Sequence, residues 1–161
     1  MNRPRGNVPR PCACTTVRTA SRLLARVYDS ALQGTELNVT QLAVLRAIER
    51  MRGAPLSRVA EQLSMDRTSM YRSVAKMAEY GWLTMSEGQD ARSRSAVISE
   101  RGREVLDGAA PHWESVQSEV VDRFGRSRWS ALVDELRALS EVVDAVSEDR
   151  PSSEGAKEID S

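Results

Sequence analysis

The stretch SMDRTSMYRSVAKM, residues 64–77, determines how the rest of this sequence is interpreted. Its apolar residues Met70, Val74 and Met77 recur at helical spacing, so they share one face of a helix. Asp66 stands where a helix N-cap belongs. Hydroxyl groups and long cations gather on the other side. The pattern predicts a helix that packs on a core with one face and presents donors with the other.

The segments on both sides of this helix extend the pattern. Four apolar residues at helical spacing precede it and predict a short helix followed by a turn: Leu56, Val59, Ala60 and Leu63. After Gly81 the period changes to two, first at Leu83 and Met85 and again at Ala96 and Ile98, which predicts a two-stranded hairpin. Helix, turn, helix and hairpin in this order predict a winged helix-turn-helix.

Longer helices flank this core motif. The first should begin at a cap at Thr15 or Thr16 and end near Gly34, and the second should begin at Thr40. Ser99 should cap a long helix that Pro111 kinks, and Ser127 should cap the last one. The last helix carries an apolar stripe: Trp129, Leu132, Val133, Leu136, Leu139, Val142, Val143 and Val146.

The expected fold class is mainly α with a small β-hairpin wing. We expect a flexible arm at residues 1–14, a helical dimerisation region at 15–34 and 104–146, a winged helix-turn-helix DNA-binding domain at 35–103, and a disordered acidic tail at 147–161. A chain of 161 residues is about one domain long. It has no apolar run long enough to span a membrane and no apolar leader, so a cytoplasmic protein with no membrane partner is expected.

The net charge of zero does not argue against a nucleic-acid partner, because the charges are unevenly spread. Residues 1–49 and 50–103 each carry a net charge of +4, whereas residues 104–161 carry −8. The local field of a surface governs its encounter with phosphate more than the total charge does. The middle segment can therefore meet DNA, because its arginines can grip guanine and its lysine can neutralise phosphate. The candidate DNA contacts are Arg67, Thr68, Ser69, Arg72, Ser73, Lys76, Arg92 and Arg94.

Two segments carry a resemblance to a known family. The run LSRVAEQLSMDRTSMYRSVAKMAEYGWL, residues 56–83, and the run DARSRSAVISERG, residues 90–102, resemble MarR-family winged helix-turn-helix regulators. The resemblance implies that Asp90 orders the wing by pairing with an arginine and that Arg92 reaches DNA. Ser64 departs from the family pattern, in which glycine is frequent at this turn. A left-handed Ser64 would cost about 1 kcal/mol.

The same resemblance implies a dimeric regulator, more often a repressor, that binds a pseudo-palindromic double-stranded operator. The first, fifth and sixth helices would form the homodimer and cover the apolar stripe. A small aromatic or phenolic effector would release the DNA, and no cofactor is implied. The expected effector-binding residues are Arg18, Arg22, Tyr28, His112 and Trp113.

Other functions receive less support from the sequence. Cys12 and Cys14 leave three roles open, as unreactive thiols, a redox sensor or metal ligands, and we favour the first. A complete zinc site is not expected, because His112 is the only histidine. No catalytic motif is recognisable, so the protein is not expected to be an enzyme. A thiol-sensing regulator and a winged-helix protein-interaction module that does not bind DNA remain the alternative functions.

Overall fold

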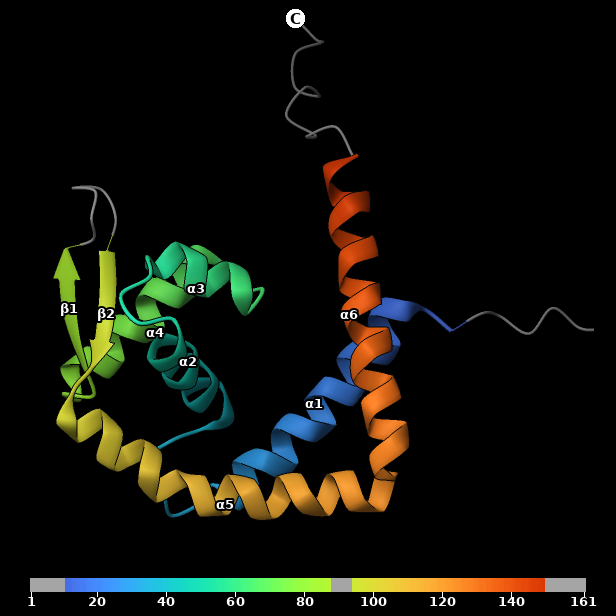
Figure 1. The fold of residues 1–161 in the computed structure, drawn as a ribbon, viewed down its shortest axis with the longest axis horizontal. Helices are drawn as coiled ribbons and strands as arrows, with labels where there is room; N and C mark the ends of the chain where they lie inside the picture. The colour runs from blue at the N-terminus through green and yellow to red at the C-terminus, as the bar shows by residue number, and fades with distance from the viewer. Residues whose placement is uncertain (1–10, 88–93, 150–161) are drawn as a thin grey trace, which may run out of the picture. The chain divides into compact units, whose positions relative to one another are not determined.

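The computed structural model describes residues 11–87 and 94–149, which form helices and one antiparallel hairpin (Figure 1). This confirms the expected fold class. The chain divides into two compact units, Met1–Val116 and Gln117–Ser161. No helix within the described ranges is both long and apolar enough to cross a membrane.

The first unit contains the predicted winged helix-turn-helix. Its elements follow in the order α1 (Ala13–Ala31), α2 (Val39–Arg50), α3 (Leu56–Gln62), α4 (Arg67–Glu79), β1 (Leu83–Glu87), β2 (Arg94–Ile98) and the greater part of α5 (Glu100–Phe124). β1 pairs with β2 so that Leu83 lies opposite Ile98 and Glu87 opposite Arg94. α4 packs against β1, while α2 and α3 contact β2. The hairpin therefore lies beside the two helices of the motif.

Three expected helix caps are wrong. α1 follows Cys12, so Thr15 and Thr16 both lie inside that helix. α2 begins after Asn38, whose side chain accepts a hydrogen bond from Gln41 N at 2.8 Å while the Gln41 side chain accepts one from Asn38 N at 3.0 Å. This reciprocal capping box satisfies two free backbone donors, whereas Thr40 lies inside the helix. α6 (Arg126–Glu148), in the second unit, follows Gly125, whose φ of 100° favours glycine. Ser127 therefore lies inside α6.

The long α5 runs through Pro111 from Glu100 to Phe124. Ser99 caps it as predicted, because its Oγ accepts a hydrogen bond from Gly102 N at 3.0 Å. The same Oγ donates to the Gly81 carbonyl at 2.6 Å. One hydroxyl thus joins the start of α5 to the turn that precedes the hairpin.

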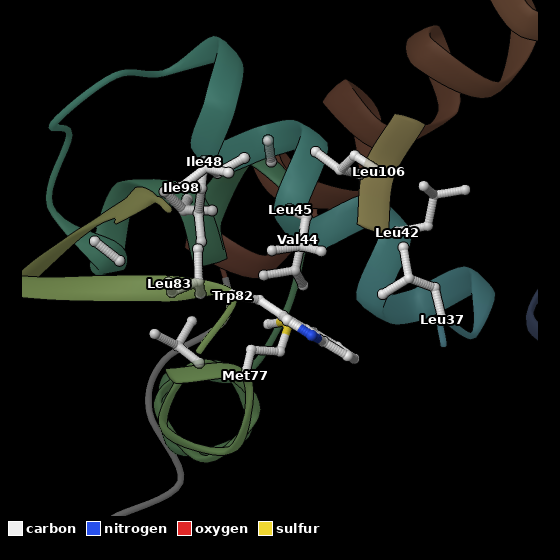
Figure 2. Packing of buried hydrophobic residues seen from close by; sticks show 14 of the residues in the cluster. Leu37, Leu42, Val44, Leu45, Ile48, Met77, Trp82, Leu83, Ile98 and Leu106 are labelled. Atoms are coloured by element: carbon white, nitrogen blue, oxygen red, sulfur yellow. The ribbon is translucent and has the colours of Figure 1, made fainter. Parts of the chain in front are cut away.

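One hydrophobic cluster holds the first unit together (Figure 2). It combines residues of α2, α3, α4, the hairpin and α5, and its fully buried large side chains include Leu42, Leu45, Leu56, Met70 and Met77. Burial of each such side chain contributes about 1.5–3 kcal/mol. The buried side of α4 is therefore fixed, and its opposite side faces outward.

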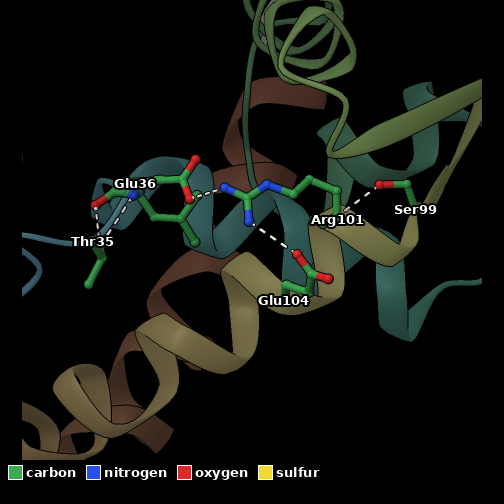
Figure 3. A network of polar contacts seen from close by, with 7 residues as sticks. Thr35, Glu36, Ser99, Arg101 and Glu104 are labelled. Carbon is green, nitrogen blue, oxygen red and sulfur yellow. Dashed lines mark hydrogen bonds and ion pairs between the residues drawn. The ribbon is translucent and has the colours of Figure 1, made fainter.

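A polar network fastens the first turn of α5 to the loop between α1 and α2 (Figure 3). Arg101 pairs with Glu36 of that loop and, at 3.1 Å, with Glu104 one turn further along α5. The Thr35 hydroxyl closes the loop by donating to the Leu32 carbonyl at 2.8 Å. The network connects the helix behind the wing to the segment that leads into α2.

Candidate nucleic-acid interface

α4 has the two faces that the sequence predicts. Met70, Val74 and Met77 are buried, and the Asp66 side chain accepts a hydrogen bond from Ser69 N at 3.0 Å as the N-cap. The other predicted side chains lie on the surface: Arg67, Thr68, Ser69, Arg72 and Lys76 are exposed and Ser73 is half-buried. α4 therefore presents cations and hydroxyl groups together, which is the chemistry that base edges and phosphates accept.

The turn between α3 and α4 contains a strained residue. Ser64 has a φ of 48°, and among the described residues it is the one non-glycine with a positive φ. Ser64 therefore has the left-handed conformation whose cost was considered above, about 1 kcal/mol relative to glycine. Met65 N donates to the Ala60 carbonyl at 2.9 Å across the same turn. This turn sets the angle at which α4 leaves α3.

The wing is described only in part. Arg94 is the first residue of β2 and is exposed. Asp90 and Arg92 lie outside the described residues, so their expected roles in ordering the wing and in binding DNA stay predictions. Inside the hairpin the hydroxyls of Ser86 and Ser95 share a hydrogen bond of 2.8 Å. This bond joins the two strands on their way to the tip.

The structure adds charged and aromatic residues to this surface that the sequence analysis did not select. Glu61 of α3 pairs with Arg58 at 3.4 Å and with Arg67 at 3.6 Å. At the other end of α4, the Lys76 ammonium lies 5.8 Å from the centre of the Tyr80 ring. The i,i+3 spacing of Arg58 and Glu61 was visible in the sequence, but the pairing with Arg67 depends on the turn.

A pocket of about 250 Å³ lies between α2, the end of α3 and α5 in the first unit. Its lining residues are Val39, Leu42, Ala43, Arg46, Arg50, Leu63 and Trp113. The Arg46 guanidinium lies 4.0 Å from the centre of the Trp113 ring. Burial lowers the pKa of Arg46, with Glu114 and Glu49 acting in the opposite direction. Within the described ranges, no carboxylate lies within ion-pair distance of this guanidinium.

One of the predicted effector residues lines this pocket. Trp113 lines this pocket, whereas Arg18, Arg22 and His112 are exposed and do not line it. Tyr28 is buried in α1, and burial raises its pKa. Arg46 and Arg50 were missed in the sequence analysis. The available signal was Arg46 itself, a cation between the buried positions Leu45 and Ala47.

The cysteines lie at the start of α1, where Cys12 is the N-cap residue and Cys14 is in the first turn. The helix begins at Ala13, so it includes the end of the expected arm. Both thiols are free and exposed. Hydrogen bonds from the backbone and then the side chain of Thr15 lower the pKa of Cys12. In the described part of the chain no group of three or more His, Cys, Asp and Glu side chains could hold a metal ion.

Comparison with known proteins supports the same fold and class. The IclR helix-turn-helix domain model matches residues 41–86. The Mycobacterium tuberculosis transcriptional regulator MosR, solved in complex with DNA, is 31% identical with a TM-score of 0.76, over 84% of this chain and 98% of MosR. Comparison with curated protein sequences finds no match.

Two more distant structures share the fold. Bordetella bronchiseptica BpsR, described as regulated in its DNA binding by 6-hydroxynicotinic acid, has a TM-score of 0.70 at 18% identity, covering 81% of this chain and 95% of BpsR. Escherichia coli MarR in its apo form has a TM-score of 0.63 at 14% identity, covering 80% of this chain and 96% of MarR.

The fold, the cationic face of α4 and the match to MosR define a DNA-binding winged helix-turn-helix transcriptional regulator. These relatives are regulators rather than enzymes. The chain belongs to the MarR family. Family membership favours a DNA-binding regulator over the alternative of a protein-interaction module.

Proposed function

We propose that the protein is a homodimeric repressor that binds a pseudo-palindromic operator through α4 and the wing and leaves it when a small aromatic acid binds. The observation that carries the DNA-binding part is the exposed face of α4, with Arg72 in the middle of the helix. A two-fold symmetric dimer predicts half-sites about one helical turn apart. Footprinting on the DNA upstream of its own gene would locate them.

Arg72→Ala tests this interface. If Arg72 binds a base edge, its loss should weaken operator binding by about 1–3 kcal/mol, mostly as lost discrimination against mismatched sites. Titration of operator and scrambled duplexes measures both quantities. Arg137→Ala on α6 removes another exposed charge outside the motif and should leave discrimination unchanged. An Arg72→Ala variant that folds, dimerises and still discriminates as wild type does would place the DNA elsewhere.

Removing a wing arginine should affect DNA binding differently from removing Arg72. Arg92→Ala should weaken operator and random DNA about equally if Arg92 meets phosphate, and should lower the salt slope by about 1 per half-site. Arg94, exposed at the start of β2, is expected to act in the same way. The contrast with Arg72 separates positioning from sequence recognition.

The proposed homodimer rests on apolar surface that the chain leaves uncovered. On α1, Val17, Leu23, Leu24 and Val27 are 37–50% exposed. On α6, six members of the predicted stripe are 36–60% exposed, namely Leu132, Leu136, Leu139, Val142, Val143 and Val146. Single exposed apolar residues are common in soluble proteins, but a continuous stripe of this kind marks an interaction surface. A second copy would cover the stripe.

The pocket beside Trp113 supports the proposed effector. A partly buried cation without a carboxylate partner is costly, and a bound carboxylate would offset this cost. The apolar lining from Leu42, Ala43 and Leu63 and the ring of Trp113 suit a single aromatic ring. 6-Hydroxynicotinic acid, which regulates DNA binding by BpsR, likewise combines an aromatic ring with a carboxylate. We therefore place a small aromatic carboxylate against Arg46.

Arg46→Gln tests the effector site. Benzoate and 6-hydroxynicotinate should release the wild-type protein from its operator, and the variant should need at least about tenfold more of either, because a charge-assisted hydrogen bond is lost. Arg123→Gln makes the same change on α5 outside the pocket and should respond as wild type does. Neutral benzamide should be inactive. Equal responses from both variants would exclude Arg46 as the carboxylate ligand.

A thiol response is the second candidate for the release signal, supported by the exposure and lowered pKa of Cys12. We expect it not to be the main switch. Replacing Cys12 and Cys14 together by serine should leave operator affinity and effector response within about threefold of wild type. If mild peroxide releases the wild-type protein and not the serine variant, the thiols are the sensor.

A further inference from the structure

One carboxylate bridges two cations of the helix-turn-helix. Glu61 Oε2 lies 3.4 Å from Arg58 Nη1 on α3, and Glu61 Oε1 lies 3.6 Å from Arg67 Nη2 on α4. The three side chains are 52–72% exposed. Ion pairs as exposed as these contribute little to stability. These ion pairs therefore affect mainly the electrostatic field of the surface rather than the stability of the fold.

The other carboxylates of this motif are arranged differently. Asp66 is engaged at the N-cap, where it accepts from Ser69 N. Glu79 is the last residue of α4. Glu61 alone among these three pairs with an arginine within the described ranges, and one of its partners, Arg67, begins the helix proposed to enter the groove.

We propose that Glu61 is an intramolecular counter-ion that restrains phosphate binding by Arg58 and Arg67 and so sets the DNA affinity and salt dependence of this surface. The inference rests on the proposed function, in which α3 and α4 face DNA. A phosphate that approaches either arginine must replace Glu61 or remain close to its charge. Non-specific binding is almost entirely electrostatic, so Glu61 chiefly limits residence on random DNA.

The expected size follows from Coulomb attraction. A unit charge about 7 Å from a phosphate in water changes affinity about threefold per half-site at low salt. Glu61→Gln should therefore bind a random-sequence duplex about threefold more tightly per half-site at about 50 mM salt. The slope of log affinity against log salt should steepen by about 1 per half-site. The gain should vanish at high salt, because exposed charges are screened.

Glu119→Gln is the matched control. Glu119 pairs with Arg123 at 2.6 Å on α5, outside the helix-turn-helix, so this variant makes the same charge change and also releases an arginine. Its affinity and salt slope should stay at wild-type values. Equal gains from both variants would show that net charge alone is responsible and would overturn the proposal. Light scattering and thermal melting check that the assembly and the fold are intact.

Two further results decide the mechanism. In an Arg58→Gln/Arg67→Gln background, the gain from Glu61→Gln should shrink, because no paired arginine remains to be released; an undiminished gain would overturn the counter-ion role. Weaker binding by a folded Glu61→Gln variant would show that Glu61 instead orients the arginines. If Arg72→Ala loses discrimination between operator and scrambled DNA while Glu61→Gln binds as wild type does, the DNA-binding interface is supported and the counter-ion role of Glu61 is refuted. If neither variant differs from wild type, the proposed DNA-binding interface itself is refuted.

Discussion

Replacing Leu136 and Leu139 by glutamine should separate the proposed dimer into monomers or unfold it. Both residues are 38–39% exposed in the single chain and belong to the apolar stripe of α6. Each glutamine would bury an unpaired amide in an apolar seam at about 1–3 kcal/mol, and two-fold symmetry places four such groups in one dimer. A loss of at least about 4 kcal/mol raises the dimer Kd on the order of 10³-fold.

Light scattering and sedimentation at micromolar concentration measure this change, and operator binding should decline with it. Glutamine is a good helix former, so α6 itself should persist. Ala138→Gln together with Ala145→Gln is the control, because both alanines are exposed on the other side of α6 from the stripe. This control should remain dimeric. A wild-type protein that is monomeric at these concentrations would refute the dimer directly.

Gly102→Ala should destabilise the fold more than other single-methyl changes in α5. A Cβ at Gly102 would lie 2.1 Å from the Trp82 carbonyl oxygen and 3.0 Å from Ile98 Cγ2. That carbonyl also accepts a hydrogen bond from Ser99 N at 3.1 Å, so it cannot move away without loss. Because backbone rather than a flexible side chain must shift, the expected cost is about 3 kcal/mol or more.

Denaturant unfolding with an unchanged m-value measures the effect. Gly108→Ala is a control of opposite sign in the same helix, since nothing lies within 4 Å of a Cβ there. It should stabilise the protein by about 0.5–1 kcal/mol because alanine favours helix. If the two variants were equally stable, the close contact between α5 and Trp82 would not exist in solution.

The sequence alone determined the helix-turn-helix and its exposed chemistry. Periodic burial encodes which side of α4 packs inward, so Met70, Val74 and Met77 could be separated from Arg72 and Lys76 without coordinates. The caps at Asp66 and Ser99 were also predictable, because each depends on residues close along the chain. Cap predictions were wrong where several polar residues lie close together, as at Asn38 and Thr40. Residue type alone does not show which of two neighbouring polar residues caps the helix.

The tertiary structure alone decided which distant side chains meet. Arg46 meets Trp113, and Arg67 of α4 meets Glu61 of α3, because the packing of helices brings together residues that no local period relates. The expected effector residues Arg18 and His112 were chosen by resemblance to the family; both are exposed in the structure, and neither lines that pocket. Local interactions fix the helices, the strands and the faces they present, whereas the pocket at Arg46 and the pairing of Glu61 with Arg67 arise from close packing between elements.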